Sequence, residues 1–353
     1  MTLRPGAVLL LGGLAVLSSR VQAQQRAVTL ADAIRLSERV QPLVVRAAGD
    51  LETAAAQRRS AWGAYLPSLT ASSSASSFFS EGTSRVDPVT GQLLSGNSSN
   101  RSLSTSLSAS VDLFTGFRRG AEGRAARASQ TAAEASFVDA RFQQALETTN
   151  QFLDALAARQ LLRVRESSVR RAEEQLKTSI AKLRAGSATR SDSLRSRVTL
   201  GNAQLDLIRT RTDLAAAEAG LARLIGETGR VSASDDSAFY QVGQMPDTAA
   251  IRAEAEAKSP RIQSASAVAA ELTARLAELD AARLQIEITL TSVLAATEDL
   301  RVQQERYRVG ASTIVDVLTS QEALNQAEVD VVVARFDYLR AKASLEALIG
   351  RTL

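Results

Sequence analysis

Cysteine and histidine are both absent from this chain of 353 residues. Their absence removes disulfides, the thiol nucleophile, the commonest metal ligands and the imidazole base. No Gly-x-Ser-x-Gly elbow, phosphate-binding loop or glycine-rich dinucleotide fingerprint occurs either. We therefore expect no enzyme, no cofactor and no metal site. A hydrolase that uses carboxylates is a formal alternative without a motif to support it.

Long apolar runs are also scarce. The run near the N-terminus, Ala7–Leu17, follows Arg4 and precedes Val21–Ala23, whose composition suits a cleavage site. This layout predicts a secretory signal peptide over residues 1–23 and export of the remainder, with a buried N-terminal helix as the alternative. No later run approaches the roughly 20 apolar residues that a membrane-spanning helix requires.

Neither sign of charge dominates. The chain has 42 basic and 38 acidic residues, and removal of Arg4 and Arg20 with the signal peptide leaves 40 against 38, a net charge of +2. The charges alternate along the sequence instead of clustering, which is typical of helical surfaces that carry many salt bridges. We expect no nucleic-acid partner.

Proline is rare as well. Six prolines leave long windows rich in Ala, Leu, Glu, Arg and Gln, which favour helix. We expect a first helical stretch over 29–66, interrupted near Pro42, and a much longer helix over 118–184. At 1.5 Å per residue the second helix would extend for about 100 Å. A helix of that length needs helical neighbours, so we predict a coiled coil.

Between these helices the chain is rich in serine and poor in charge. Polar and apolar residues alternate over 102–113 with one exception, Thr105, and this pattern and length suit a tilted membrane strand. The predicted lipid-facing residues are Leu103, Leu107, Ala109, Val111 and Leu113. Residues 68–79 give a weaker signal for a partner strand. A disordered serine-rich linker is the alternative for both segments.

A duplicated unit occupies much of the C-terminal half. Residues 168–226 match residues 292–350 at 22 of 59 positions, which indicates a structural repeat. In the blocks 184–194 and 308–318, a glycine that can close a helix precedes a Thr-x-x-Asp capping box that can start the next. Each block is therefore expected to be the tip of a helical hairpin. The candidate tip residues are Arg184, Gly186, Thr189, Asp192 and Leu194, and Arg308, Gly310, Thr313, Asp316 and Leu318.

The charged tip residues allow two interpretations each. Asp192 and Asp316 are either simple helix caps or members of a carboxylate ring that attracts cations at an entrance. Arg184 and Arg308 either complement the negative end of a helix or contact a partner protein. The sequence leaves both alternatives open.

In this order, the motifs resemble the outer-membrane factor family, of which TolC is the type member. The resemblance covers nearly all of the exported chain. It includes Ala-Ile-Arg at 33–35 with Pro42, Tyr-Leu-Pro-Ser-Leu at 65–69, Leu-Phe-Thr-Gly-Phe-Arg at 113–118, the two tips, and the terminal Leu-Ile-Gly at 348–350.

The resemblance implies a mainly α fold of long antiparallel coiled-coil helices, an α-barrel subunit, with one inserted β-hairpin for a transmembrane β-barrel. The first repeat would cover 24–226 and include the β-hairpin at about 68–115. An inter-repeat linker or equatorial segment would follow at 227–250, and a truncated second repeat at 251–353.

The resemblance also implies a homotrimer in the outer membrane of a Gram-negative bacterium, extending into the periplasm. It would be the passive channel subunit of a tripartite efflux or type I secretion system. Its partners would be a periplasmic adaptor (membrane fusion) protein, an inner-membrane pump and outer-membrane lipid. The tips would meet the adaptor and narrow the entrance.

The second repeat departs from the family pattern. Pro42 and Gly186 are 144 positions apart, whereas Pro260 and Gly310 are only 50 apart, so about 94 residues are missing near Leu284–Ile286. The second strand pair should lie there. The apolar positions that would let the remnants continue as one helix are Leu276, Leu279, Ile286, Leu290 and Val293.

This loss bears directly on conduction. A trimer with one hairpin per chain would supply six strands instead of twelve, too few to enclose a solute path. A degenerate family member, a non-conducting periplasmic coiled coil, or a chain whose barrel is completed by other chains therefore remain alternatives.

Overall fold

The computed structural model describes residues 26–94, 98–235 and 265–349. The expected signal peptide at 1–23, the later part of the inter-repeat linker, and Gly350 lie outside these ranges. The chain divides into two compact units: one is Arg46–Val138, and the other combines the residues on either side of it.

The first helical stretch is interrupted next to its proline, as predicted. Helix α1, Leu30–Val40, begins after Thr29, whose side chain accepts a hydrogen bond from the Asp32 main-chain N–H. Helix α2 then covers Pro42–Gly63. Gln41 between them is extended because the ring of a following proline disfavours helical backbone in the preceding residue.

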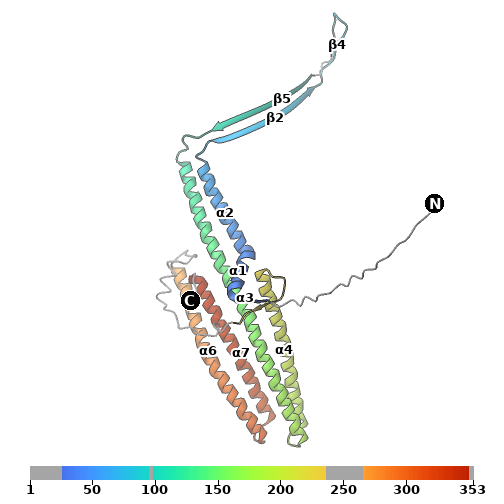
Figure 1. Cartoon of the computed structure of the whole chain (residues 1–353), viewed down its shortest axis with the longest axis vertical. Coiled ribbons are helices and arrows are strands. Elements are labelled where there is room, and N and C mark those ends of the chain that lie inside the picture. Colours follow the sequence, from blue (N-terminus) through green and yellow to red (C-terminus); the bar gives the residue numbers. More distant parts are fainter. Residues whose placement is uncertain (1–25, 95–97, 236–264, 350–353) are drawn as a thin grey trace, which may run out of the picture. The chain divides into compact units, whose positions relative to one another are not determined.

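Helix α3 has the predicted bounds, Arg118–Arg184. Left-handed backbone at Gly116 and Phe117 precedes it. Helix α4, Arg190–Ile225, returns alongside the second half of α3 and completes a helical hairpin (Figure 1).

The second repeat forms an all-helical hairpin in the described residues. Helix α6, Ala265–Arg308, continues without a break through Leu284–Ile286, which confirms the prediction of one fused helix. Helix α7, Ile314–Ile349, has 36 residues, the same length as α4. Residues of α6 that recur at helical spacing on one face of the helix are buried beside α7. They are Leu272, Leu276, Leu279, Ala282, Ile286, Leu300 and Tyr307.

One apolar cluster joins the two hairpins. Phe336 of α7 is fully buried against Phe152 and Leu156 of α3 and against Leu221 of α4. A short parallel pair of strands, β1 (Arg26–Val28) and β6 (Val231–Ala233), belongs to the same cluster. None of the helices in the described part of the chain has the length and apolar character needed to cross a membrane.

The unit at Arg46–Val138 carries an antiparallel hairpin of two equal strands. Strand β2 covers Ser68–Ser80 and β5 covers Ser98–Ser110. The short strands β3 (Arg85–Val86) and β4 (Leu93–Leu94) pair in the loop between them.

The predicted second strand, 102–113, was misplaced at both ends. Ser68 pairs with Ser110, so the next partner of Val111 would be Pro67, which has no N–H to donate and ends the ladder. Val111 and Leu113 therefore lie beyond the strand. At the other end, β5 begins four residues earlier than predicted, because it pairs along the full length of β2.

Candidate functional site: hairpin tips, groove and strand faces

The first tip closes α3 with a left-handed glycine. Gly186 has a φ of 72°. Its N–H donates to the Leu183 carbonyl at 3.1 Å, and the Ser187 N–H donates to the Lys182 carbonyl at 2.9 Å. These two bonds satisfy carbonyls that the end of a helix would otherwise leave without partners.

The second tip repeats this geometry. Gly310 has a φ of 82°, its N–H donates to the Tyr307 carbonyl at 3.2 Å, and the Ala311 N–H donates to the Arg306 carbonyl at 2.8 Å. No atom lies within 4 Å of a Cβ added at Gly186 or Gly310, so the backbone conformation alone requires glycine there.

Both tips then start the next helix with a reciprocal capping box. The Thr189 N–H donates to an Asp192 carboxylate oxygen at 2.9 Å, and the Asp192 N–H donates to the Thr189 hydroxyl at 3.2 Å. In the second tip the equivalent distances between Thr313 and Asp316 are 2.8 and 3.3 Å. The Thr313 hydrogen bonds lower the pKa of Asp316 below its usual 3.8. Both aspartates therefore act as caps.

The remaining tip residues differ in their surroundings. Arg308 pairs with Glu305 one turn earlier at 2.9 Å, whereas Arg184 is exposed and forms no ion pair within the described residues. Leu194 is 51% exposed. Leu194 and Leu318 line opposite walls of one groove.

A contact that no sequence motif indicated joins the two tips. The Lys182 ammonium lies 3.8 Å from the centre of the Tyr307 ring and also donates to the Tyr307 carbonyl. Burial raises the pKa of Tyr307, and the negative charge of Asp192 acts in the same direction. Basic residues are favoured in the last turn of a helix, so Lys182 does not stand out in the sequence as a residue with a distant partner.

A second polar contact between the hairpins lies further from the tips. Arg171 of α3 forms two hydrogen bonds with the Glu328 carboxylate of α7, at 3.1 and 2.6 Å, and donates to the Asn325 amide oxygen at 2.6 Å. A two-bond arginine–carboxylate pair fixes the orientation of both side chains. This contact therefore holds α3 and α7 in register.

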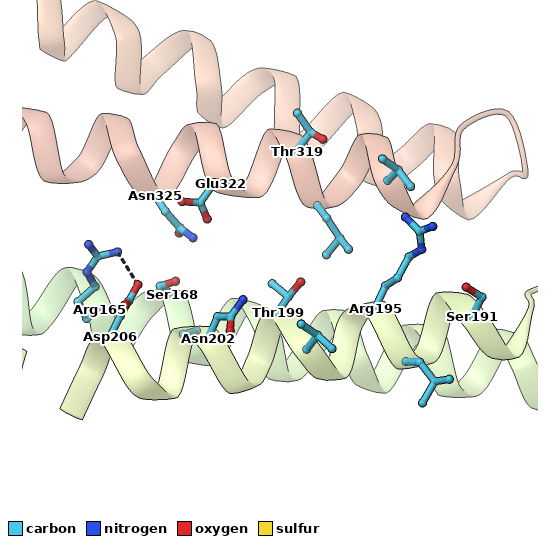
Figure 2. Close-up of a pocket in the computed structure, with 15 residues that line it drawn as sticks. Arg165, Ser168, Ser191, Arg195, Thr199, Asn202, Asp206, Thr319, Glu322 and Asn325 are labelled. Carbon is cyan, nitrogen blue, oxygen red and sulfur yellow. Dashed lines mark ion pairs between the residues drawn. The ribbon is translucent and has the colours of Figure 1, made fainter. Parts of the chain in front are cut away.

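An open groove of about 660 Å³ lies between α4 and α7, and α3 contributes Arg165 and Ser168 at one end (Figure 2). Arg195 and Thr199 extend into it from α4, and Glu322 extends into it from α7 opposite Asn202. At one end Arg165 and Asp206 approach within 3.7 Å. The groove presents apolar side chains between charges of both signs.

The β2–β5 hairpin has two chemically different faces. Leu103, Leu107 and Ala109 lie on one face, where their cross-strand partners are Ala75, Ala71 and Leu69. The hydroxyl pair Ser73–Thr105 interrupts this mainly apolar face between Leu103 and Leu107. The opposite face carries only hydroxyls over five successive pairs, four of which are hydrogen-bonded at 2.7–2.8 Å. These pairs are Ser68–Ser110, Thr70–Ser108, Ser72–Ser106, Ser74–Ser104 and Ser76–Ser102.

The described residues contain no group of three or more acidic side chains that could hold a metal ion. The structure contains two helical hairpins with the same closed turn, and an inserted β-hairpin with one mainly apolar face and one hydroxyl face. That combination is the fold of the TolC-like α-barrel subunits.

The profile of the outer membrane efflux protein family matches residues 33–227, so the chain belongs to this family. No curated protein sequence matches the chain significantly. Three solved structures illustrate the shared fold. VceC of Vibrio cholerae is 17% identical with a TM-score of 0.65, and the match covers 92% of this chain and 96% of VceC.

The other two structures are similarly distant in sequence. CusC is 15% identical with a TM-score of 0.70, covering 91% of this chain and 92% of its own. The open state of the MtrE outer membrane channel of Neisseria gonorrhoeae is 16% identical with a TM-score of 0.68, covering 91% and 89%.

Proposed function

We propose that this chain is an outer-membrane channel subunit of a tripartite efflux or type I secretion system and serves as a passive conduit across the periplasm. The observation that carries the proposal is the pair of matching hairpin tips on helices α4 and α7 of equal length. Two equivalent turns per chain would give a trimer six turns around one entrance. The channel descriptions of CusC and MtrE support the same function.

In this proposal the β-hairpin enters the outer membrane as part of a sheet shared among chains. Leu103, Leu107 and Ala109 face lipid, and the hydroxyl face meets water. Val111 and Leu113 lie just past the strand, at the boundary. A strand edge without a partner is costly in hydrocarbon, so the edges of β2 and β5 require neighbouring strands.

The tips in this proposal contact a periplasmic adaptor and narrow the entrance. Opening would require the two hairpins to separate at their ends, and so would break the Lys182–Tyr307 contact before the deeper Arg171–Glu328 pair. Transport then uses no catalytic residue. An inner-membrane pump supplies the energy.

A second candidate is a periplasmic coiled coil that does not conduct. Helix α6 favours it, because the second repeat has no strand pair between Ala265 and Ile349. With one β-hairpin per chain, a trimer has six long strands. A barrel of eight strands is only just wide enough to enclose a core of side chains, so a barrel of six has no room for a pore. A pore would need strands from other chains.

Cell fractionation tests the choice. If the chain is a channel subunit, we expect trimers in the outer-membrane fraction that dissociate on heating. A periplasmic monomer that does not bind lipid would refute the proposal. For the purified chain alone in planar bilayers we expect no stable conductance, because six strands do not enclose a path. A stable, large conductance would contradict that expectation.

A further inference from the structure

An exposed aromatic cluster surrounds the junction where α2 passes into β2 and β5 passes into α3. Four rings from the two chain segments contribute: Trp62, Tyr65, Phe114 and Phe117, with exposed fractions of 64, 50, 78 and 84%. We call residues 58–66 and 112–127 the junction collar. Such exposure of large aromatic side chains is typical of an interaction surface.

The backbone next to two of these rings, Phe114 and Phe117, has an unusual conformation. Phe117 has a φ of 64°, the one left-handed residue other than glycine in the described part of the chain, and it follows left-handed Gly116. Phe114 and Phe117 meet edge to face, with ring centres 5.9 Å apart. Burial does not explain this unfavourable conformation, since both rings are largely exposed, so a partner outside the chain is the better explanation.

The collar is also strongly basic. It contains six arginines and two acids, a net charge of +4 (6 − 2), whereas β2 and β5 together carry one charged residue, Arg101. The two acids are engaged: Glu122 pairs with Arg118 at 3.2 Å, and Asp112 with Arg119 at 3.6 Å.

Three further collar arginines are exposed and form no ion pair within the described residues. They are Arg59, Arg124 and Arg127. Two of them lie on the first turns of α3 and one on the last turns of α2, so the positive charge is spread over both helices. In both helices the positively charged turns lie close in sequence to the aromatic side chains. Arg119 links the two features, because its guanidinium lies 5.6 Å from the centre of the Tyr65 ring.

We propose that the junction collar docks onto anionic phospholipid headgroups of the membrane leaflet next to the periplasm. Aromatic rings favour the headgroup level of a bilayer, and arginines beside it are attracted to anionic lipid. The strands, which carry a single charge, and the basic turns of the two helices fit the boundary between hydrocarbon and headgroup. This proposal rests on the proposed outer-membrane function.

The chain offers a direct probe, because Trp62 is its single tryptophan and lies in the collar. The full chain is reconstituted into bilayers of phosphatidylcholine and phosphatidylglycerol in which one lipid or the other is brominated. Bromine quenches tryptophan fluorescence only at short range. We expect stronger quenching of Trp62 by brominated phosphatidylglycerol than by brominated phosphatidylcholine at equal mole fraction, and a weaker difference at high salt.

The variant Arg59→Gln, Arg124→Gln, Arg127→Gln should lose this preference, by about fivefold in relative lipid affinity for each arginine removed. Lysine at the same three positions should retain most of it. A matched control, Arg39→Gln, Arg211→Gln, Arg223→Gln, removes three exposed arginines that also lack ion pairs in the described residues and lie outside the collar. The control should keep the wild-type preference, and circular dichroism verifies that each variant is folded.

The outcomes separate the two proposals. Equal quenching by the two brominated lipids, or loss of preference in the control as well, would overturn the collar proposal and leave the outer-membrane function standing. A Trp62 signal that neither lipid quenches would place the collar outside any bilayer, and the proposed function would then fail with it.

Discussion

The two hairpin tips have the same backbone conformation but differ in net charge. Both have the closing glycine, the threonine and the aspartate that their hydrogen bonds require. Residues 182–197 nevertheless carry five basic side chains and one acid, a net +4 (5 − 1), whereas 306–321 carry two and one, a net +1 (2 − 1). Arg190, Arg195 and Arg197 correspond to uncharged residues in the second copy.

The comparison shows which residues the conformation of the turn requires and which surface residues can change without altering that conformation. Positions with a backbone role kept their residue types after duplication, whereas several exposed positions of the first tip, including Arg190, Arg195 and Arg197, have different residue types in the second. Ile314, the counterpart of exposed Arg190, is buried beside Leu300 and Tyr307. A partner that contacts both tips would therefore meet two chemically different surfaces.

The largest expected effect comes from comparing the tip glycines with the one that ends α4. Gly226 is also left-handed, with a φ of 74°, but a Cβ there would lie 2.8 Å from a methyl carbon of Val40. Gly226→Ala should cost about 3 kcal/mol from strain and overpacking together. Gly186→Ala and Gly310→Ala should each cost about 1–2 kcal/mol from strain alone. Denaturant unfolding checks the order, and equal losses at all three would contradict it.

The next largest effect is expected at Lys182, because in the described residues only the first tip uses its basic residue to contact the other tip. Lys182 reaches across to Tyr307, whereas its counterpart Arg306 donates to Ala311 within its own turn. Lys182→Gln should weaken the link by about 1–2 kcal/mol, the range of a cation–aromatic contact plus a charged hydrogen bond.

Spin labels at Ser187 and Ala311 would measure the separation of the tips. We expect a broader and longer distance distribution in Lys182→Gln and an unchanged one in the control Arg306→Gln. A similar broadening in both variants would show that general charge, and not this contact, holds the tips together.

The smallest effect concerns pH at the second tip. The pKa of Asp316 is lowered in the folded chain, so its stabilising contribution is complete above its usual 3.8 and is lost as pH falls through the folded pKa. Asp316→Asn removes this contribution. Between pH 7 and pH 3 the melting temperature of the variant should therefore fall less than that of the wild type, and parallel curves would argue against the capping role.

Local signals predicted the helices well. Helix α3 has its predicted bounds, because the glycines that flank it, Gly116 and Gly186, can be recognised directly in the sequence. The fused α6 was predictable from the regular spacing of its apolar residues. Tertiary and register effects were not predictable in this way. The Lys182–Tyr307 contact joins residues 125 positions apart, and the end of β5 depends on a proline in the opposite strand.

The hydroxyl face of the β-hairpin has a further property that follows from its composition. All ten side chains from Ser68 to Ser76 and from Ser102 to Ser110 on that face are serine or threonine, and none of them titrates near neutral pH. This face therefore presents the same hydrogen-bond donors and acceptors to water at acidic and at alkaline pH. Any sensitivity of the molecule to acidity must reside elsewhere, in its helices and turns.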